Sequence, residues 1–370
     1  MKKSVAIIGT RGYPSYYGGF ETAVRKIAPY LADAGWDVTV YGRPESIRMD
    51  DPERDPRVHS RSTRGIESKS LSTLSYGLTA SWDAMRRKPD VVIVMNVANG
   101  YFLPLLKLRG IRTLVNVDGI EWHREKWGRA AKKVFRIGAR MTKWFADALV
   151  MDSHEIGQRW KQTFSRSGAF IPYGGDSVDR LPVEPGLEHR GYVLVVARFV
   201  PENTIPQFLE AARTISQAIP VVIVGTTGYG GELDSRAAQL TKEIDEVHWL
   251  GHISDDARLL ALWQHAAVYF HGHSVGGTNP TLVQAMAAGS PVVARDTPYN
   301  REVLGEGGFF CDPNPTAIAT TILTLAGDAN AQREASTSNL ERAKSKYTWD
   351  AVCEAYEAAI TDLLTKGELT

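Results

Sequence analysis

His271-Gly272-His273-Ser274-Val275-Gly276-Gly277-Thr278-Asn279-Pro280 runs directly into Thr281-Leu282-Val283-Gln284-Ala285-Met286-Ala287-Ala288-Gly289-Ser290-Pro291-Val292-Val293-Ala294. This stretch predicts a strand end, a glycine loop, a short helix and a new strand, with Asn279 as N-cap and Gly289 as the stop. The first N–H groups of a helix lack partners and the dipole is positive there, which suits a phosphate or a sugar phosphate. A well-capped structural helix explains the same pattern, so both interpretations stay open.

The beginning of the chain has the order of a Rossmann-like domain. Val5 to Ile8 predict a buried strand, and a long glycine-containing loop leads into a helix whose apolar face repeats every three or four residues. The glycines at 9, 12, 18 and 19 are spaced too widely for the dinucleotide fingerprint G-x-G-x-x-G. A NAD-dependent dehydrogenase is therefore a disfavoured alternative, while Gly18 and Gly19 would let a ligand approach the backbone closely.

Strands alternate with helices along the rest of the chain, which indicates parallel sheets covered on both faces. The pattern restarts at 192–198 after a polar, proline-containing linker, and two similar halves suggest a cleft between them. We expect an N-terminal domain over 1–180 and a C-terminal domain over 181–345. A final helix within 346–370 is expected to pack back on the N-terminal domain.

The bulk composition is that of an ordinary globular protein. The chain has 370 residues, of which 43% are hydrophobic and 23% charged, and its net charge of +1 favours no nucleic-acid partner. Its two cysteines, Cys311 and Cys353, are far apart and lack metal-ligand spacing, which fits a reducing compartment. The first apolar run is too short for a secretory or membrane-spanning segment, so a cytoplasmic location is expected.

A polar and aromatic cluster follows the strand predicted at 112–117. Asp118, Glu121 and His123 lie there, at the carboxyl end of a strand, which is where open α/β sheets bind ligands. They are candidates for holding sugar hydroxyls or for handling an acceptor proton. Ordinary ion pairs within a loop are the equally weighted alternative.

Positive charge concentrates in a predicted amphipathic helix near 124–145, which includes Lys126, Arg136 and Lys143. Such a surface can attract anionic lipid headgroups, with roughly 1 kcal/mol per Lys or Arg near the membrane surface. A solvated basic helix that packs by its aromatic side is the alternative. The first interpretation places the protein at the inner face of the membrane as a peripheral partner.

Several motifs in the same order resemble the family 4 retaining glycosyltransferases of the GT-B fold. These motifs are Gly18-Gly19-Phe20-Glu21, Ile171-Pro172-Tyr173-Gly174-Gly175-Asp176, Ala197-Arg198 with Pro201-Glu202-Asn203, His248-Trp249-Leu250-Gly251, and Gln284 to Ala294. The resemblance spans nearly the whole chain. It implies an α/β protein with two Rossmann-like domains that face each other across a cleft, the N-terminal one (1–180) on the acceptor side and the C-terminal one (181–345) binding the nucleotide sugar. Gly9 to Pro14, Asp118 to Trp122 and His271 to Pro280 are similar to a bacterial subgroup that includes rhamnosyltransferases of capsule and cell-surface polysaccharide synthesis.

The resemblance also implies roles for particular residues. Arg198 would neutralise the donor diphosphate, and Asn203 stands where a second cation, lysine, is common in the family. The family's two glutamates correspond to Gly276, where the donor-sugar contact is lost, and to Gln284, which could still bond one ribose hydroxyl. The remaining donor contacts would come from Gly18, Gly19, Gly277, Thr278 and Asn279, and the base contacts from Trp249 and Leu250.

The expected reaction is transfer of a hexosyl group, with L-rhamnosyl from dTDP-rhamnose as the first choice, to a glycan or a lipid-linked glycan with retention. A deoxyribose donor would need only the one bond from Gln284. No metal or other cofactor is required in this view, and His271 with His273 is too weak a pattern to indicate a metal site. The alternatives are a transferase for a UDP- or GDP-hexose, a nucleotide-sugar-binding protein with weak or no transferase activity, and a nucleotide-sugar epimerase or hydrolase.

Overall fold

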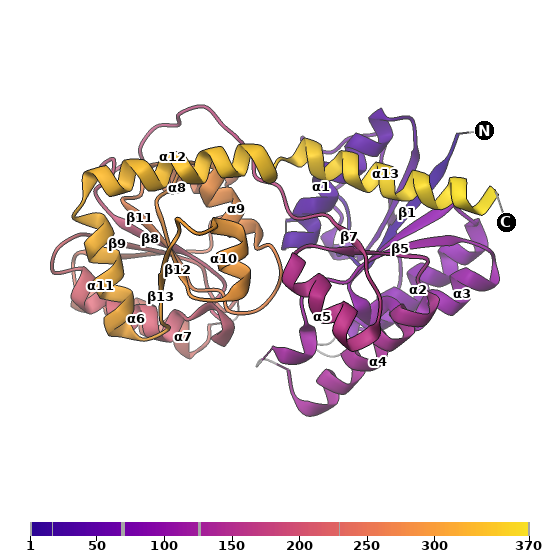
Figure 1. The fold of residues 1–370 in the computed structure, drawn as a ribbon, viewed down its shortest axis with the longest axis horizontal. Coiled ribbons are helices and arrows are strands. Elements are labelled where there is room, and N and C mark those ends of the chain that lie inside the picture. Colours follow the sequence, from indigo (N-terminus) through magenta and orange to yellow (C-terminus); the bar gives the residue numbers. More distant parts are fainter. Residues whose placement is uncertain (1, 17, 68–70, 125–126, 229, 369–370) are drawn as a thin grey trace. The chain divides into compact units, whose positions relative to one another are not determined.

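The computed structural model describes residues 2–16, 18–67, 71–124, 127–228 and 230–368. The chain divides into an N-terminal unit, Met1–Pro172 with Trp349–Thr370, and a C-terminal unit, Tyr173–Thr348. Each unit is a parallel sheet with helices packed on it (Figure 1), which confirms the expected pair of α/β domains. The sequence analysis placed the limits at residues 180 and 345, and those limits stay predictions.

The sheet of the N-terminal unit has the strand order β3-β2-β1-β4-β5-β6-β7. Every neighbouring pair is parallel. The strands are β1 (Ser4–Ile8), β2 (Asp37–Gly42), β3 (His59–Ser62), β4 (Val91–Met95), β5 (Arg112–Asn116), β6 (Ala148–Met151) and β7 (Ala169–Phe170). The short strand β3 lies at one edge of the sheet.

The sheet of the C-terminal unit has the order β10-β9-β8-β11-β12-β13, and all its pairs are also parallel. The strands are β8 (Val193–Val196), β9 (Val221–Val224), β10 (Val247–Gly251), β11 (Val268–His271), β12 (Val292–Arg295) and β13 (Phe309–Cys311). Numbered within the unit, this is the doubly wound order 3-2-1-4-5-6, in which the direction of winding reverses between β8 and β11.

Helices cover both sheets. The N-terminal unit carries α1 (Gly19–Asp33), α2 (Ser72–Arg87), α3 (Leu103–Leu108), α4 (Arg129–Phe145), α5 (His154–Phe164) and α13 (Trp349–Glu368), with 3₁₀ turns η1 (Pro44–Ser46), η2 (Val97–Phe102) and η3 (Glu121–His123). The C-terminal unit carries η4 (Pro201–Asn203), α6 (Ile205–Ile215), α7 (Glu232–Glu243), α8 (Asp256–His265), α9 (Pro280–Ala287), α10 (Pro298–Leu304), α11 (Pro315–Ala326) and α12 (Ala329–Lys346). The basic helix expected near 124–145 is α4, which begins only at Arg129; Lys126 lies outside the described residues.

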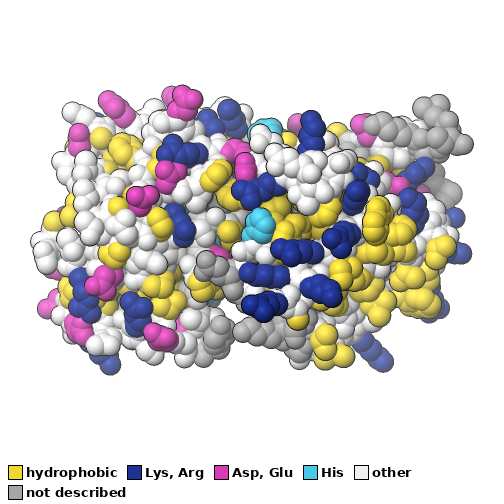
Figure 2. Space-filling view, turned by 60° about the horizontal axis from the view of Figure 1, so that its bottom comes forward, with side chains coloured by type: hydrophobic (Ala, Val, Ile, Leu, Met, Phe, Trp, Pro, Cys, Tyr) yellow, Lys and Arg dark blue, Asp and Glu magenta, His cyan; other side chains and the backbone are white. Residues whose placement is uncertain are grey.

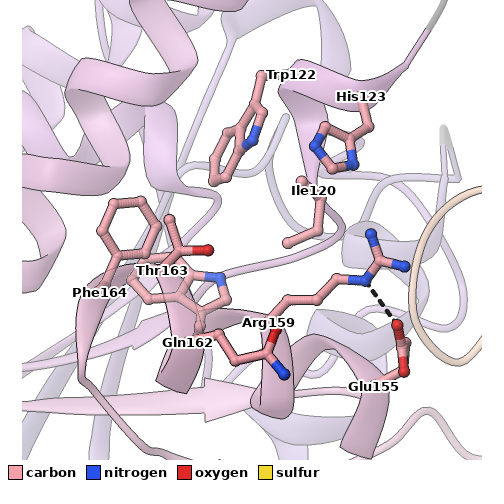
Figure 3. Close-up of a pocket in the computed structure, with 9 residues that line it drawn as sticks. Ile120, Trp122, His123, Glu155, Arg159, Gln162, Thr163 and Phe164 are labelled. Atoms are coloured by element: carbon pink, nitrogen blue, oxygen red, sulfur yellow. Dashed lines mark hydrogen bonds and ion pairs between the residues drawn. The ribbon is translucent and has the colours of Figure 1, made fainter.

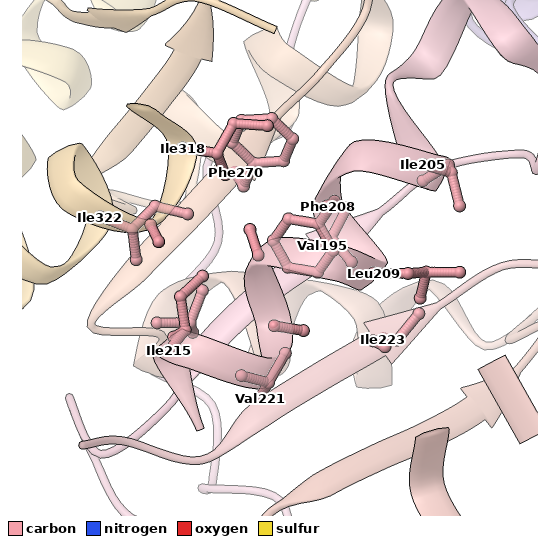
Figure 4. Packing of buried hydrophobic residues seen from close by; sticks show 14 of the residues in the cluster. Val195, Ile205, Phe208, Leu209, Ile215, Val221, Ile223, Phe270, Ile318 and Ile322 are labelled. Carbon is pink, nitrogen blue, oxygen red and sulfur yellow. The ribbon is translucent and has the colours of Figure 1, made fainter. Parts of the chain in front are cut away.

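The core of the C-terminal unit shows why these runs form strands. Val195 and Phe270 are fully buried on one face of the sheet, against Phe208 from α6 and Ile318 from α11 (Figure 4). The Phe208 and Phe270 rings stack with centroids 5.1 Å apart. Both faces of a parallel sheet are covered by helices, so its strands are continuous runs of β-branched and aromatic residues.

The last helix, α13, belongs to the N-terminal unit although it ends the chain. The Asn116 amide Nδ2 donates to the Tyr356 hydroxyl at 2.7 Å, with both groups buried, and the Trp36 indole donates to Glu357 at 3.2 Å. The same Asn116 side chain accepts a hydrogen bond of 2.9 Å from the backbone N–H of Asp118. The C-terminal helix therefore supports the loop that follows β5.

Tyr356→Phe removes the acceptor of the Asn116 amide without opening a cavity. An unpaired buried donor costs about 1 to 3 kcal/mol, and we expect the free energy of unfolding of the N-terminal unit to fall by that amount. Urea unfolding followed by circular dichroism measures this loss. Unchanged stability would show that the bond between α13 and β5 contributes nothing.

Candidate functional site

The C-terminal unit brings three polar loops together at the carboxyl edge of its sheet. Arg198 follows β8, residues 272–279 follow β11, and Arg295 ends β12. The strands β8 and β11 are neighbours, and the winding reverses between them. Open α/β sheets bind ligands at such a switch point, outside the carboxyl ends of the strands.

Hydrogen bonds fix the loop after β8 against the loop after β11. The Ser274 N–H donates to the Glu202 carbonyl at 2.9 Å, and the Thr204 hydroxyl donates to the Gly272 carbonyl at 2.6 Å. A Cβ on Gly272 would lie 2.4 Å from the Asn203 carbonyl oxygen, so only glycine permits this approach. The edge of the sheet is thus a preformed surface, which is what binding a charged substrate group requires.

Arg198 and Asn203 occupy this surface in different ways. Arg198 is solvent-exposed, and its carbonyl accepts hydrogen bonds from Val200 N–H and from the Asn203 amide at 2.8 Å. Asn203 is 6% exposed, and its amide oxygen lies 2.5 Å from His273 Nδ1. The guanidinium can therefore reach a ligand, whereas the Asn203 side chain joins the two loops. Its predicted donor contact stays a prediction.

The predicted helix start is confirmed in α9. The Asn279 side chain accepts from the Thr281 N–H at 3.0 Å, with Pro280 at the first helical position. Gly276 has a φ of 128°, a backbone conformation that L side chains rarely adopt. A glutamate at Gly276 would be strained, so this loop is shaped for glycine. Gly277 and Thr278 are buried in the same loop.

Gln284 makes two hydrogen bonds to the backbone within the C-terminal unit, and the ribose contact that the resemblance implies stays a prediction. Its Oε1 accepts from the Asp176 N–H at 3.0 Å and its Nε2 donates to the Asp176 carbonyl at 2.9 Å. Next to Asp176, the Gly175 N–H donates to the Tyr347 carbonyl at 2.8 Å. A neutral amide can both donate and accept in this way, whereas an ionised carboxylate can only accept. Gln284 therefore anchors the segment that enters the C-terminal unit to α9.

Trp249 and Leu250 project to opposite faces of the C-terminal sheet, as neighbours on a strand must. Trp249 packs on the cluster around Phe208, its ring stacks 6.2 Å from Phe199, and its indole N–H donates to the Gly225 carbonyl at 2.8 Å. Leu250 packs on the cluster of the other face, around Leu282. The proposed base contacts stay a prediction, and the two side chains cannot stack on one base from the same side.

His271 and His273, at the end of β11 and in the loop after it, contact different partners. Burial lowers the pKa of His271 to about 3, so its ring is neutral, and its Nδ1 lies 3.0 Å from the Tyr269 hydroxyl. His273 faces Asn203 instead. In the described part of the chain, no three His, Cys, Asp or Glu side chains gather where they could hold a metal ion. The expectation of a metal-free reaction stays a prediction.

Arg295 and Asn300 are site residues that the sequence analysis missed. The Arg295 guanidinium donates to the Thr204 hydroxyl at 3.1 Å, next to Asn203. The buried Asn300 amide donates to the carbonyls of His273 and Arg295, at 2.9 and 2.8 Å, and so joins β12 to the loop after β11. The sequence did contain a signal for Arg295: it directly follows the buried run Val292-Val293-Ala294, as Arg198 follows the apolar run that ends at Ala197.

In the N-terminal unit, Gly18 and Gly19 form the start of α1, with Gly18 as its extended N-cap. The buried Glu21 carboxylate accepts from the Arg11 N–H at 2.9 Å and from the Thr10 hydroxyl at 3.3 Å. The first turn of α1 therefore holds the loop that follows β1. The structure places Gly18 and Gly19 at a helix start, as predicted; their contact with a donor stays a prediction.

Asp118 and Glu121 lie together, joined by one cation. Arg124 Nε is 2.5 Å from Glu121 Oε1, and Arg124 Nη2 is 4.0 Å from Asp118 Oδ1. Glu121 is 4% exposed and also accepts from the Trp127 indole at 2.7 Å. Asp118 is more accessible, and it accepts from Asn96 Nδ2 at 3.0 Å. The ion pairs of the alternative interpretation are thus present, and Asp118 is the carboxylate better placed to meet a ligand.

His123 faces a separate cavity of about 270 Å³ between η3 and α5 (Figure 3). Trp122 and Phe164 line it together with Arg159, whose Nε is 2.7 Å from Glu155. Desolvation and the nearby cations Arg159, Arg136 and Lys132 lower the pKa of His123. Its imidazole is therefore neutral near pH 7, and a neutral ring can accept a proton.

Gln284→Glu tests the anchoring role of this side chain. The carboxylate cannot donate to the Asp176 carbonyl and would face it with a negative charge, so we expect a loss of about 1 to 3 kcal/mol of stability at neutral pH. The loss should shrink in acid, where the new carboxyl becomes protonated. Thermal and urea unfolding measure it, with Gln217→Glu in the exposed turn after α6 as control. Equal effects of both substitutions would contradict the role.

The fold is shared with solved glycosyltransferase structures. Sucrose-phosphate synthase from Thermosynechococcus elongatus superimposes with a TM-score of 0.77 at 21% identity, over 99% of this chain and 100% of that chain. Anabaena HepE in complex with UDP-glucose gives a TM-score of 0.74 at 15% identity, over 99% and 100% of the two chains. At these identities the likeness establishes the fold, which is GT-B.

Among curated proteins, this chain is similar to bacterial mannosyltransferases. It is 29% identical over 226 residues to a phosphatidyl-myo-inositol mannosyltransferase of Mycobacterium leprae, covering 58% of this chain and 59% of that protein. It is 25% identical over 187 residues to the O-antigen chain mannosyltransferase B of Escherichia coli, covering 47% of this chain and 49% of that protein. The alignments thus span between half and three fifths of these relatives.

Two family models match the two halves of the chain. Residues 18–174 match the glycosyl transferase 4-like domain, and residues 179–342 match glycosyl transferases group 1. The matches follow one another and together span most of the sequence, on the same two α/β units that the structure separates. The chain therefore belongs to the glycosyltransferases of the GT-B fold.

Proposed function

We propose that this protein is a retaining hexosyltransferase that moves a sugar from a nucleotide-sugar donor to a hydroxyl of a glycan or lipid-linked glycan. The observation that carries the proposal is the exposed guanidinium of Arg198 on the locked loop after β8, at the switch point of the sheet. The names of the relatives support it, since they include an O-antigen chain mannosyltransferase and a phosphatidyl-myo-inositol mannosyltransferase.

The leaving group of such a reaction is a nucleoside diphosphate, which gains negative charge as the glycosidic bond breaks. Arg198 would stabilise that charge, with the start of α9 contributing its positive end. Asn203 brings no charge. The Arg295 guanidinium donates a hydrogen bond to the hydroxyl of Thr204, the residue that follows Asn203. We infer that Arg295 supplies the second cation of this site.

Retention needs no protein nucleophile in this scheme. The departing diphosphate accepts the proton of the acceptor hydroxyl on the face where the new bond forms, so the protein orients the two substrates and stabilises the leaving group. Asp118 would hold an acceptor hydroxyl, and no metal is needed for the charge. A metal-free assay in chelator tests this last point.

Two donor classes remain. The resemblance of His271 to Pro280 to the rhamnosyltransferase subgroup favours dTDP-rhamnose, whereas the mannosyltransferase relatives and HepE, solved with UDP-glucose, favour a GDP- or UDP-hexose. Both hydrogen-bonding ends of Gln284 already contact Asp176. The argument that a deoxyribose needs only one bond from Gln284 therefore no longer separates the two classes.

Thermal unfolding with a panel of nucleotide sugars tests the donor. A ligand that binds only the folded state at about 100 times its Kd stabilises it by about 2.7 kcal/mol. We expect one donor to raise Tm clearly above the others. A rise with dTDP-rhamnose alone would establish the first choice, and a rise with a UDP- or GDP-sugar alone would replace it. No response to any donor would contradict the proposed function.

Arg198→Ala should lower turnover roughly 100-fold to 1,000-fold, since removal of one charge-stabilising donor from a transition state costs about that much. Steady-state transfer of labelled sugar measures it. Arg213→Ala, which removes an exposed cation paired with Glu243 on α6 and α7, is the matched control. Near-normal turnover of the Arg198 variant would exclude its role. Donor binding without turnover in the unsubstituted protein would favour the alternative of a silent binding protein.

We also propose peripheral membrane contact through α4. Lys133, Arg136 and Arg140 are exposed on this helix, and its Trp144 side chain is 60% exposed. Figure 2 shows Lys and Arg side chains gathered on one face, with hydrophobic side chains beside them. None of the described helices is long and apolar enough to cross a bilayer. Basic groups beside an exposed indole match an anionic membrane surface.

Cosedimentation with vesicles tests this contact. The protein should bind vesicles that contain phosphatidylglycerol more tightly than neutral phosphatidylcholine vesicles, and salt should weaken the binding. Lys133→Gln with Arg140→Gln should reduce it roughly 30-fold, because each of the two charges contributes about 1 kcal/mol. Arg213→Gln with Arg236→Gln on the C-terminal unit is the control. Equal binding to both vesicle types would contradict the contact.

A further inference from the structure

The cavity between η3 and α5 has a built apolar wall. Trp122 and Phe164 meet edge to face with ring centroids 6.0 Å apart, and Trp160 lies 4.7 Å from Phe164. All three rings line the cavity of about 270 Å³, just below the size range of sites for drug-sized ligands. The space and the flat aromatic wall suit one sugar ring, whose C–H faces pack well on aromatic side chains.

One buried donor on this wall lacks a partner. Trp160 is 1% exposed, and its indole Nε1 has no hydrogen-bond acceptor among the described residues. Buried polar groups are nearly always paired, and an unmade hydrogen bond costs about 1 to 3 kcal/mol. The N–H is covered by neighbouring atoms, so a ligand oxygen that displaced them and accepted from it would remove that cost. The Gln162 amide and the Thr163 hydroxyl, at the rim, are further groups that can bind oxygen (Figure 3).

The charge around the cavity is positive. The positive charges of Arg159 and of Arg136 and Lys132 from α4 help to lower the pKa of His123. Glu155 neutralises Arg159 at 2.7 Å, whereas Lys132 and Arg136 make no ion pair with any residue that the structure describes. Both cations lie close enough to His123, which lines the cavity, to act on its ring, and positive charge at that place attracts a negative group.

We propose that this cavity binds an anionic sugar unit, a hexose that carries a phosphate or a carboxylate. The aromatic wall holds the ring, the Trp160 indole donates to one of its oxygens, and Lys132 with Arg136 attract the charge. The site is distinct from the residues that would handle the donor diphosphate. Its assignment to the acceptor, as a subsite for an anionic sugar of the growing glycan, rests on the proposed function; binding itself does not.

Isothermal titration of the full chain with glucose 1-phosphate, glucuronate, glucose and inorganic phosphate tests the proposal. At least one anionic sugar should bind ten or more times tighter than glucose and than phosphate, and the stronger of the two identifies the anion. Equal binding of glucose would make the site one for neutral sugars, and equal binding of phosphate would make it a plain anion site. Either result overturns the proposal, as does the absence of binding.

Variants locate the site. Trp160→Phe keeps an aromatic side chain but removes the five-membered ring that carries the N–H, and we expect the affinity for the anionic sugar to fall about fivefold to tenfold. Trp263→Phe, which removes another buried and unpartnered indole N–H from the C-terminal unit, is the matched control and should change nothing. Thermal unfolding verifies that both variants fold.

Charge and position are tested separately. Lys132→Gln with Arg136→Gln should weaken the anionic sugar while leaving glucose unaffected, and Lys133→Gln with Arg140→Gln on the same helix should not. Thr163→Val removes a hydroxyl from the exposed rim of the cavity. It tests the position of the site a second time, with little risk to folding. Loss of binding in Arg198→Ala but not in Trp160→Phe would place the anion at the donor residues and refute this cavity. None of these measurements requires turnover, so they stand apart from failure of the transferase assay.

Discussion

The hydrogen bonds of one buried amide hold the candidate donor surface together. Asn203 donates to the Arg198 carbonyl and contacts His273 through its oxygen, so it joins the loop after β8 to the loop after β11. Asn300 repeats the device between β11 and β12. These bonds fix the backbone below Arg198 before any ligand arrives. A guanidinium on such a rigid base can stabilise a developing charge without first reorganising the protein.

The sequence predicted the parts of this molecule that obey local rules. Buried strands are continuous apolar runs, and Asn279, Pro280 and Gly289 mark the limits of α9, so both sheets and that helix could be recognised. Several helices were missed, including α2, α5, α7 and α12, because surface helices rich in polar residues depend on packing that no local pattern reveals. The start of α4 was placed too early because charge, and not a cap, defined it.

For the candidate site, the sequence predicted which residues lie at the edge of the sheet but not which contacts their side chains make. That Arg198 and residues 271–279 end neighbouring strands follows from the α/β pattern, because parallel strands bring their carboxyl ends to one edge. What each side chain does there depends on partners far away in the sequence. Gln284 meets Asp176 across 108 positions, and Asn203 meets His273 across 70. The positive φ of Gly276 likewise shows that a glutamate would be strained at this position, which the sequence alone does not reveal.

The return of α13 to the N-terminal unit has a consequence for synthesis of the chain. Asn116 receives its Tyr356 partner from a helix that ends the sequence, after the whole C-terminal unit. Domains generally fold as they leave the ribosome, the N-terminal one first. Here the Asn116 amide on β5 has no Tyr356 partner until the final helix emerges, although all the strands of its sheet are made earlier. The C-terminal unit, contiguous over Tyr173–Thr348, has all its own strands earlier, so the second half of this protein can complete its fold before the first.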